Sequence, residues 1–261
     1  SDLKKEQGLN EDFLFYQLTS KLKLPKYWTA SLASNVSLWR FEGTDVIQHN
    51  DNVMTRDFAS HSRLDIQYRG PSSWNKRMGA DSLFQKNGQN YRMSYNSNIF
   101  ASYADIQYIQ SYFTGNVGVR VEYNSLSHKT DFLPRFYFGW KNNDHLLALA
   151  TGKYLQAPSS DFLKFSSHLR SATAWNSMLT YSFIPNRDKF SASLFYKRYT
   201  TLPTYTKNNV LPAFWEYKMD GSGYVYGGNV FIKKGIGLFE AWTSYALTLG
   251  KVRSNDQDVA M

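Results

Sequence analysis

Among its 261 residues the sequence contains 19 Tyr, 18 Phe and 7 Trp, yet its mean hydropathy is negative at -0.49. A water-soluble core with so many rings normally hides them behind aliphatic side chains, whereas a membrane barrel carries Tyr and Trp on its outside. The net charge of +9 comes from scattered Lys and Arg, which argues against a nucleic-acid partner, and the absence of Cys excludes disulfides and thiolate metal sites.

No apolar run approaches the ~18 to 20 residues that a transmembrane helix needs, and the dominant pattern is a period of two instead. In the first segment Leu14, Tyr16 and Leu18 alternate with Gln17 and Thr19. This alternation predicts strands with one apolar and one polar face. About twelve strands are expected, near residues 13–24, 27–41, 56–69, 74–86, 97–111, 114–125, 132–141, 144–153, 173–184, 189–200, 223–234 and 237–250.

The predicted connections alternate between short and long. Tight turns are expected at 25–26, 70–73, 112–113, 142–143, 185–188 and 235–236, and longer polar loops at 42–55, 87–96, 124–131, 154–172 and 201–222. Short connections on one side and long ones on the other are typical of outer-membrane barrels, with the tight turns in the periplasm. The pattern therefore predicts an all-β, antiparallel transmembrane β-barrel of meandering strands.

Five tryptophans lie at or near the ends of the predicted strands, where an aromatic girdle is expected. They are Trp28, Trp39, Trp74, Trp140 and Trp175. The alternative is that these rings cap the open end of a soluble barrel core.

Several stretches from about Asn98 to Gly250, in matching order and spacing, resemble the later barrel strands of TonB-dependent receptors. They are 100–108 (FASYADIQY), 118–123 (GVRVEY), 133–138 (LPRFYF), 149–158 (LATGKYLQAP), 190–203 (FSASLFYKRYTTLP), 223–231 (GYVYGGNVF) and 242–245 (WTSY). The resemblance implies a plug domain, a TonB contact and a barrel of 22 strands. We expect residues 1–261 to be a portion of such a barrel, without its plug domain or C-terminal strands.

The resemblance further implies a receptor and transporter, integral to the bacterial outer membrane, that takes up a scarce solute with energy supplied through TonB. Expected partners are outer-membrane lipid and lipopolysaccharide, the TonB complex through a plug domain outside this chain, and a surface lipoprotein. No cofactor is implied. Candidate solute-binding residues are the lumen-facing Gln107, Arg120, Glu122 and Lys197 and the loop aromatics Tyr154, Tyr205, Trp215 and Tyr217.

No catalytic or metal-binding constellation is apparent, so we do not expect an enzyme. The rival hypothesis is a complete twelve-stranded barrel acting as a phospholipase, which needs a serine nucleophile beside a histidine base. The pairs His61-Ser62 and Ser167-His168 offer both residue types, but adjacent residues on a strand face opposite sides. A passive porin or a surface adhesin is the third possibility.

Overall fold

The computed structural model describes residues 10–44, 52–71, 73–89, 95–156, 170–207, 215–237, 239–254 and 257–260. All regular structure in these ranges is β-strand. Within them, no helix combines the length and apolar character needed to cross a membrane.

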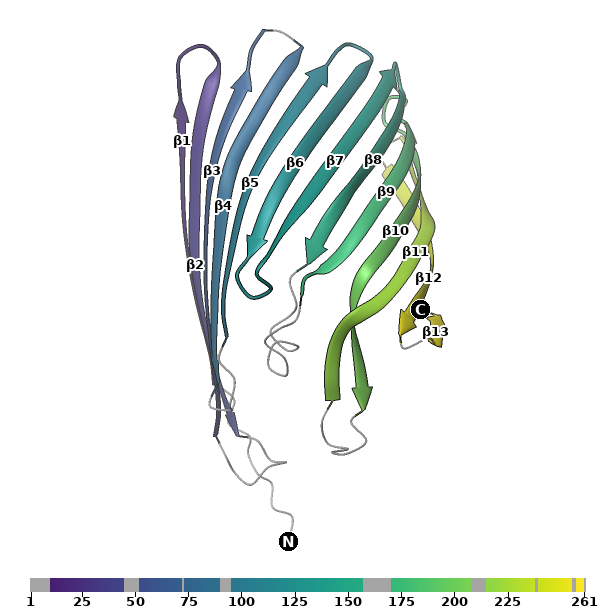
Figure 1. The fold of residues 1–261 in the computed structure, drawn as a ribbon. Coiled ribbons are helices and arrows are strands. Elements are labelled where there is room, and N and C mark those ends of the chain that lie inside the picture. Colours follow the sequence, from purple (N-terminus) through teal and green to yellow (C-terminus); the bar gives the residue numbers. More distant parts are fainter. Residues whose placement is uncertain are drawn as a thin grey trace.

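The strands form one antiparallel sheet in which each pairs only with its neighbours in sequence (Figure 1). They are β1 (Asn10–Lys23), β2 (Trp28–Thr44), β3 (Asn52–Arg69), β4 (Trp74–Gln89), β5 (Tyr95–Ile109), β6 (Phe113–Asn124), β7 (Lys129–Asn142), β8 (His145–Gln156), β9 (Ala172–Phe183), β10 (Lys189–Lys207), β11 (Trp215–Ile236), β12 (Phe239–Ser254) and β13 (Gln257–Ala260). The predicted meander is confirmed, and the four-residue β13 is an addition to it.

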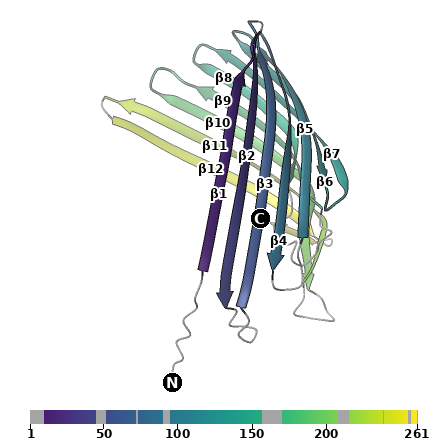
Figure 2. The ribbon, with the colours of Figure 1, turned by 90° about the vertical axis from the view of Figure 1, so that its left-hand side faces the viewer.

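The sheet twists and curves, so that β9–β12 run at a steep angle behind β1–β4 in Figure 2. Strands β1 and β13 form its two edges. A right-handed twist accumulated over many strands is what allows a sheet to wrap around a bore.

Tight turns join alternate strand pairs at one end of the sheet, as predicted. Asn143 and Asn186 in these turns adopt positive φ angles of 49° and 51°, which Asn tolerates better than most residues. At the other end several predicted loops are shorter than expected. The 124–131 loop is a turn at 125–128, and the 201–222 loop is largely strand, because β10 continues to Lys207 and β11 begins at Trp215.

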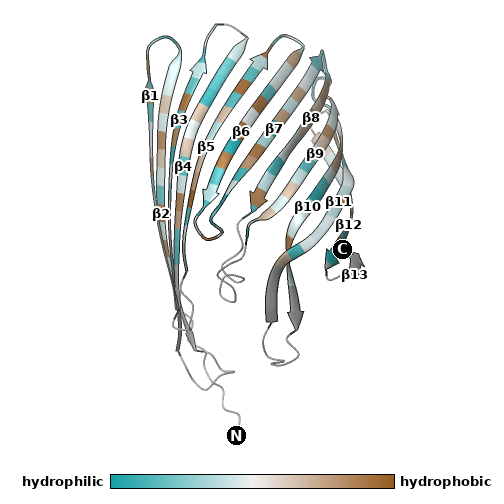
Figure 3. Ribbon diagram, viewed as in Figure 1, coloured by the Kyte–Doolittle hydropathy of each residue, from teal (hydrophilic) through white to brown (hydrophobic). Residues whose placement is uncertain are grey.

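The two faces of the sheet differ as the alternation predicts, and Figure 3 shows apolar and polar positions interleaved along the strands. Tyr16, Val121, Leu194 and Tyr245 belong to the apolar face, and 63%, 37%, 65% and 68% of their surface is exposed. The only buried hydrophobic residues in the described part are Ile99, Ala101 and Leu133. These exposures show that the apolar side chains do not gather in a dry interior.

Four of the five predicted girdle tryptophans lie on the apolar face. Trp28 packs against Tyr68 with ring centroids 5.1 Å apart, and Trp74 packs against Tyr108 at 4.7 Å, both at the tight-turn end. Trp39 corrects the prediction. Trp39 is paired with Phe13, which occupies a polar-face position in the alternation of β1, so Trp39 lies on the polar face as well. There its indole N–H donates to Glu11 at 2.7 Å.

Candidate functional site on the polar face

Two ion-pair clusters lie side by side on the polar face of β3–β6. In the first cluster, Asp65 accepts from Arg63 Nε at 2.9 Å and from Arg77 Nη2 at 2.8 Å. The Tyr103 hydroxyl also donates to Asp65, and both guanidinium groups lie over the Tyr103 ring, 4.9 and 5.4 Å from its centroid. This cluster contains two cations and one carboxylate.

The second cluster has the opposite balance, one cation and two carboxylates. Arg120 donates to both oxygens of Asp81, at 2.5 and 2.9 Å, and to Glu122 at 2.9 Å. The side chains of Asp81 and Glu122 are only 7% and 13% exposed. Because Arg63 is the direct cross-strand partner of Asp81, the two clusters adjoin and together carry three positive and three negative groups.

Small residues form the floor on which these long side chains lie. Ala101 separates Asp81 from Glu122 in the register and is 6% exposed, so the Arg120 side chain spans β5 above it. Gly79 lies between Asp65 and Tyr103, and Gly118 is paired directly with Asp105. Glycine inside a strand often marks such a close approach.

A cavity of about 410 Å³ opens beside the clusters on the polar face. Its lining includes Arg77, Asp105, Gln107, Asn116, Arg135 and Tyr154. Gln107 accepts a hydrogen bond of 3.5 Å from Asn75, and the Arg135 guanidinium lies 5.0 Å from the centroid of the Tyr154 ring. Strong cross-strand stagger brings the end of β5 near the tight turns and the end of β8 near the longer loops to one cavity.

Five of the eight predicted solute-binding residues lie on the polar face, in three groups. Gln107 and Tyr154 line the cavity, whereas Arg120 and Glu122 belong to the neighbouring ion-pair cluster. Lys197 shares the polar face but lies farther along the sheet, opposite Asn176 of β9.

All four predicted loop aromatics lie on strands, which corrects their expected location. Tyr154 belongs to β8, Tyr205 to β10, and Trp215 and Tyr217 to β11, where Tyr205 is paired with Tyr217. β10 and β11 have 19 and 22 residues, more than the about 9 to 11 that a strand needs to cross a bilayer. The hairpin therefore continues as paired strand into the residues that were expected to form a loop.

Several residues of this surface were not among the predicted site residues. They are Arg63, Asp65, Arg77, Asp81, Tyr103, Asp105, Asn116 and Arg135. Each occupies a polar position of the period-two alternation, so the alternation alone could have placed all of them on the same face. Their grouping depends on the stagger between strands, which no local pattern encodes.

The rival catalytic pair at residues 61 and 62 is split by the strand. Ser62 faces the apolar side, where its hydroxyl lies 3.0 Å from that of Ser34, and His61 occupies the polar parity. The pair at residues 167 and 168 lies outside the described residues. No group of three or more His, Cys, Asp or Glu suited to a metal ion occurs in the described part.

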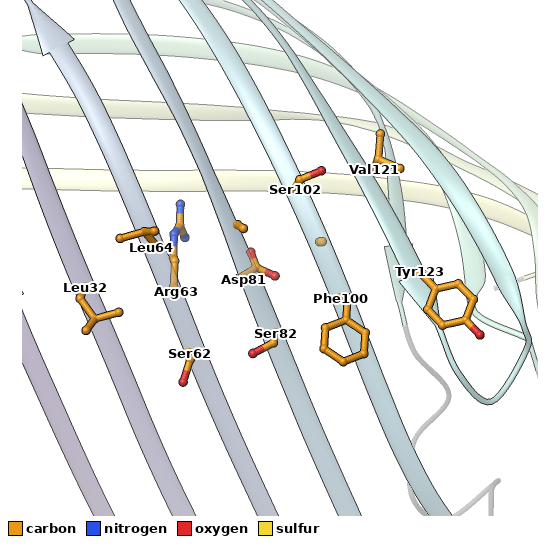
Figure 4. Close-up of a pocket in the computed structure, with 12 residues that line it drawn as sticks. Leu32, Ser62, Arg63, Leu64, Asp81, Ser82, Phe100, Ser102, Val121 and Tyr123 are labelled. Atoms are coloured by element: carbon orange, nitrogen blue, oxygen red, sulfur yellow. The ribbon is translucent and has the colours of Figure 1, made fainter.

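The opposite, apolar face has its own hollow of about 540 Å³, shown in Figure 4. It forms where Ser62, Ser82 and Ser102 stand on adjacent strands between the larger side chains of Leu32 and Tyr123. Small hydroxyl residues on a face that is otherwise apolar leave this space. Arg63 and Asp81, which belong to the two ion-pair clusters, are also among its lining residues.

The chain is similar in structure to several solved outer-membrane proteins. It superposes on the FrpB iron transporter from Neisseria meningitidis with a TM-score of 0.78 at 12% identity, and the match covers 91% of this chain and 43% of FrpB. It superposes on the siderophore receptor PirA from Pseudomonas aeruginosa with a TM-score of 0.72 at 11% identity, and this match covers 94% of this chain and 50% of PirA. For the copper transporter OprC the TM-score is 0.71 at 10% identity, and the match covers 97% of this chain and 48% of OprC.

No family model matches the sequence, and no curated protein matches it by sequence. The chain spans half or less of the length of these three solved proteins. They are TonB-dependent receptors, integral to the outer membrane of Gram-negative bacteria. In such a barrel the apolar face meets lipid and the polar face lines the lumen. The chain therefore has the fold of the barrel of TonB-dependent outer-membrane receptors.

Proposed function

We propose that the chain forms part of an outer-membrane receptor that takes up a scarce solute through its barrel, with energy delivered by TonB through a plug domain. The main support is the polar face of β3–β8, where a charge-balanced wall adjoins a cavity lined by polar and aromatic groups. The similar solved proteins are named as an iron transporter, a siderophore receptor and a copper transporter. A scarce metal or its chelate is thus the class of solute to test first.

We further propose that residues 1–261 belong to a larger barrel of 22 strands. The thirteen described strands leave β1 and β13 as unpaired edges of the sheet. Exposed edges are a liability that barrels remove by closure. Further strands pairing with both edges would complete the bore.

Within this barrel, the cavity and the ion-pair clusters are proposed to have different tasks. The clusters neutralise themselves, so they hold the wall rigid. Arg135 is exposed and carries its charge over the Tyr154 ring, so it is available to an anionic group of a passing solute or of the plug. Gln107 adds an amide in the same cavity.

Growth of the native bacterium under limitation tests the proposal. A strain lacking this gene should fail to grow when iron or copper is supplied only as a scarce chelate, and the wild-type gene should restore growth. Loss of TonB should mimic the deletion. Normal growth of the deletion strain across the whole panel of limiting solutes would contradict the proposal.

Single variants refine this experiment. Arg135→Gln and Gln107→Leu should slow uptake of the solute about tenfold if each contributes one hydrogen bond to a charged or polar group. Lys26→Gln, an exposed change in the first tight turn, serves as the matched control and should leave uptake unchanged.

The phospholipase hypothesis receives no support from these observations. Ser62 and His61 face opposite sides of β3, and the similar solved proteins are transporters and receptors.

A surface lipoprotein that covers the long-loop end remains part of the proposed assembly, and co-purification from the native membrane would test it.

A further inference from the structure

Three aromatic side chains stand on the lumen side of β1 and β2, a face that is otherwise polar. Phe13 and Phe15 occupy the same face of β1 as Gln17 and Thr19, and Trp39 of β2 is paired with Phe13. Phe13 is 66% exposed and Phe15 is 51% exposed. We name Phe13, Phe15 and Trp39 the aromatic shelf.

The two phenyl rings of the aromatic shelf stand nearly parallel and stay open to the lumen. The angle between their planes is 9°, and their centroids are 6.4 Å apart. A further strand paired with the free edge of β1 would not cover them, because neighbouring strands extend a sheet sideways while side chains project from its faces. Apolar groups that remain exposed together often mark a binding site.

The aromatic shelf lies near the outer mouth of the bore. On the lipid-facing side of the same strands, Leu14 is paired with Leu38, and the next row toward the long loops pairs Asp12 with Arg40. This change from apolar to charged side chains marks the outer boundary of the apolar band. A solute that enters from outside the cell would therefore meet the shelf before it reaches the cavity beside the ion-pair clusters.

The electrostatic surroundings of the aromatic shelf favour a positively charged ligand. Glu11 lies on the same face of β1, two residues before Phe13, and its carboxylate accepts the indole N–H of Trp39 at 2.7 Å. Asp57, the β3 partner of Trp39, is engaged in contacts of its own, so Glu11 is the carboxylate that we assign to the shelf. The first lumen-facing cation along β1 is Lys21, farther toward the tight turn. Because the face of an aromatic ring is also negative, the rings and Glu11 attract the same kind of ligand.

We propose that the aromatic shelf binds an organic cation, such as a quaternary ammonium group, that forms part of the solute. Aromatic rings recognise alkylated ammonium groups through cation–π attraction combined with apolar contact. Glu11 adds a negative charge at the edge of the shelf. This assignment rests on the proposed function, in which the lumen is the path of a solute, and it names the chemistry of one part of that solute.

Calorimetric titration of the purified full-length protein with choline, a quaternary ammonium compound, tests the proposal. The neutral carbon isostere dimethylbutanol has the same shape without the charge and should bind much more weakly. Phe13→Ala/Phe15→Ala should bind choline about tenfold more weakly than wild type, since two exposed cation–π contacts are lost. Glu11→Gln should weaken choline binding about threefold and leave dimethylbutanol unaffected, because the amide oxygen still accepts from Trp39 while the charge is gone.

Phe231→Ala is the matched control, because Phe231 is a lumen-facing ring toward the tight-turn end whose centroid lies 5.7 Å from the Lys189 ammonium. This variant should bind choline like wild type. Heat-modifiable migration on a gel, measured for every variant, separates loss of binding from loss of the barrel. Equal binding of choline and dimethylbutanol, or undiminished choline binding by Phe13→Ala/Phe15→Ala, would overturn the proposal. Either result can occur while the growth experiment still shows uptake, so failure of this proposal is distinguishable from failure of the proposed function.

Discussion

A methyl group added at Gly79 would lie 2.4 Å from the hydroxyl oxygen of Tyr103, its cross-strand partner on β5. The same methyl would lie 2.3 Å from the carbonyl oxygen of Leu64. The bare backbone at this position is what allows the Tyr103 ring to lie flat along the lumen wall and to reach Asp65 from two strands away.

Gly79→Ala should therefore destabilise the barrel by about 1 to 3 kcal/mol, the usual effect of overpacking, because a backbone carbonyl cannot move aside as a side chain can. Gly115→Ala on β6 is the matched control, since a methyl there meets nothing within 4 Å. Equilibrium unfolding in urea from lipid vesicles measures both. Equal stability of the two variants would show that Tyr103 and β3 adjust freely.

Removal of Arg120 would leave two carboxylates on the lumen wall, those of Asp81 and Glu122, without the cation that pairs with them. Arg120→Met is expected to lower the free energy of unfolding by about 2 kcal/mol, because hydrogen bonds to charged groups contribute about 1.5 to 3 kcal/mol and this site is partly solvated. The triple variant Arg120→Met/Asp81→Asn/Glu122→Gln should recover part of that loss, because it removes the uncompensated charges. A triple variant less stable than the single one would contradict the charge-balance argument.

Much of the fold could be predicted from the sequence because the strand alternation is local. Side chains two residues apart share a face whatever the partner strand is, so the lumen-facing positions of Gln107, Arg120, Glu122 and Lys197 follow from their neighbours alone. The tight turns likewise carry their own signals in residues such as Asn143 and Asn186.

The composition of the site could not be predicted because it depends on register. Arg120 and Asp81 are 39 residues apart and meet only through the stagger of β4, β5 and β6. The hairpin that holds Tyr205 and Tyr217 looked like a loop for a related reason. Its alternation is irregular, and register shifts interrupt the pairing between Tyr199 and Thr204.

A charge on the lipid-facing surface should be far more costly than the same charge in the lumen. Leu194 is 65% exposed and lies in the middle of the apolar band, opposite Gly228. Leu194→Arg should cost about 2 to 4 kcal/mol at this depth, whereas Asn229→Arg, one residue along β11 from Gly228 and on the lumen face, should cost far less. Refolding into vesicles measures both, and equal costs would argue against the assignment of the two faces.

The last prediction concerns the turn between β9 and β10, outside the membrane-spanning part of the strands. Hydrogen bonds from the Lys234 ammonium, and next from the Gly235 backbone N–H, lower the pKa of Asp188 below its ordinary value of 3.8. A carboxylate with a depressed pKa in the folded protein stabilises the fold above its unfolded pKa, and this stabilisation is lost as the pH falls through the folded pKa.

Asp188→Asn should therefore lower the thermal unfolding midpoint at about pH 6, and the gap from wild type should close as the pH falls below the folded pKa of Asp188, where both side chains are uncharged. Asp144→Asn in the neighbouring tight turn controls for the loss of a turn carboxylate, because Asp144 forms no ion pair with any described residue. High salt should also narrow the gap at neutral pH, since the Lys234 ammonium is exposed and its attraction to Asp188 is screened. A gap that persists undiminished in acid would mean that the substituted amide disturbs the turn by its shape, and that the charge of Asp188 contributes nothing to holding β10 against β11.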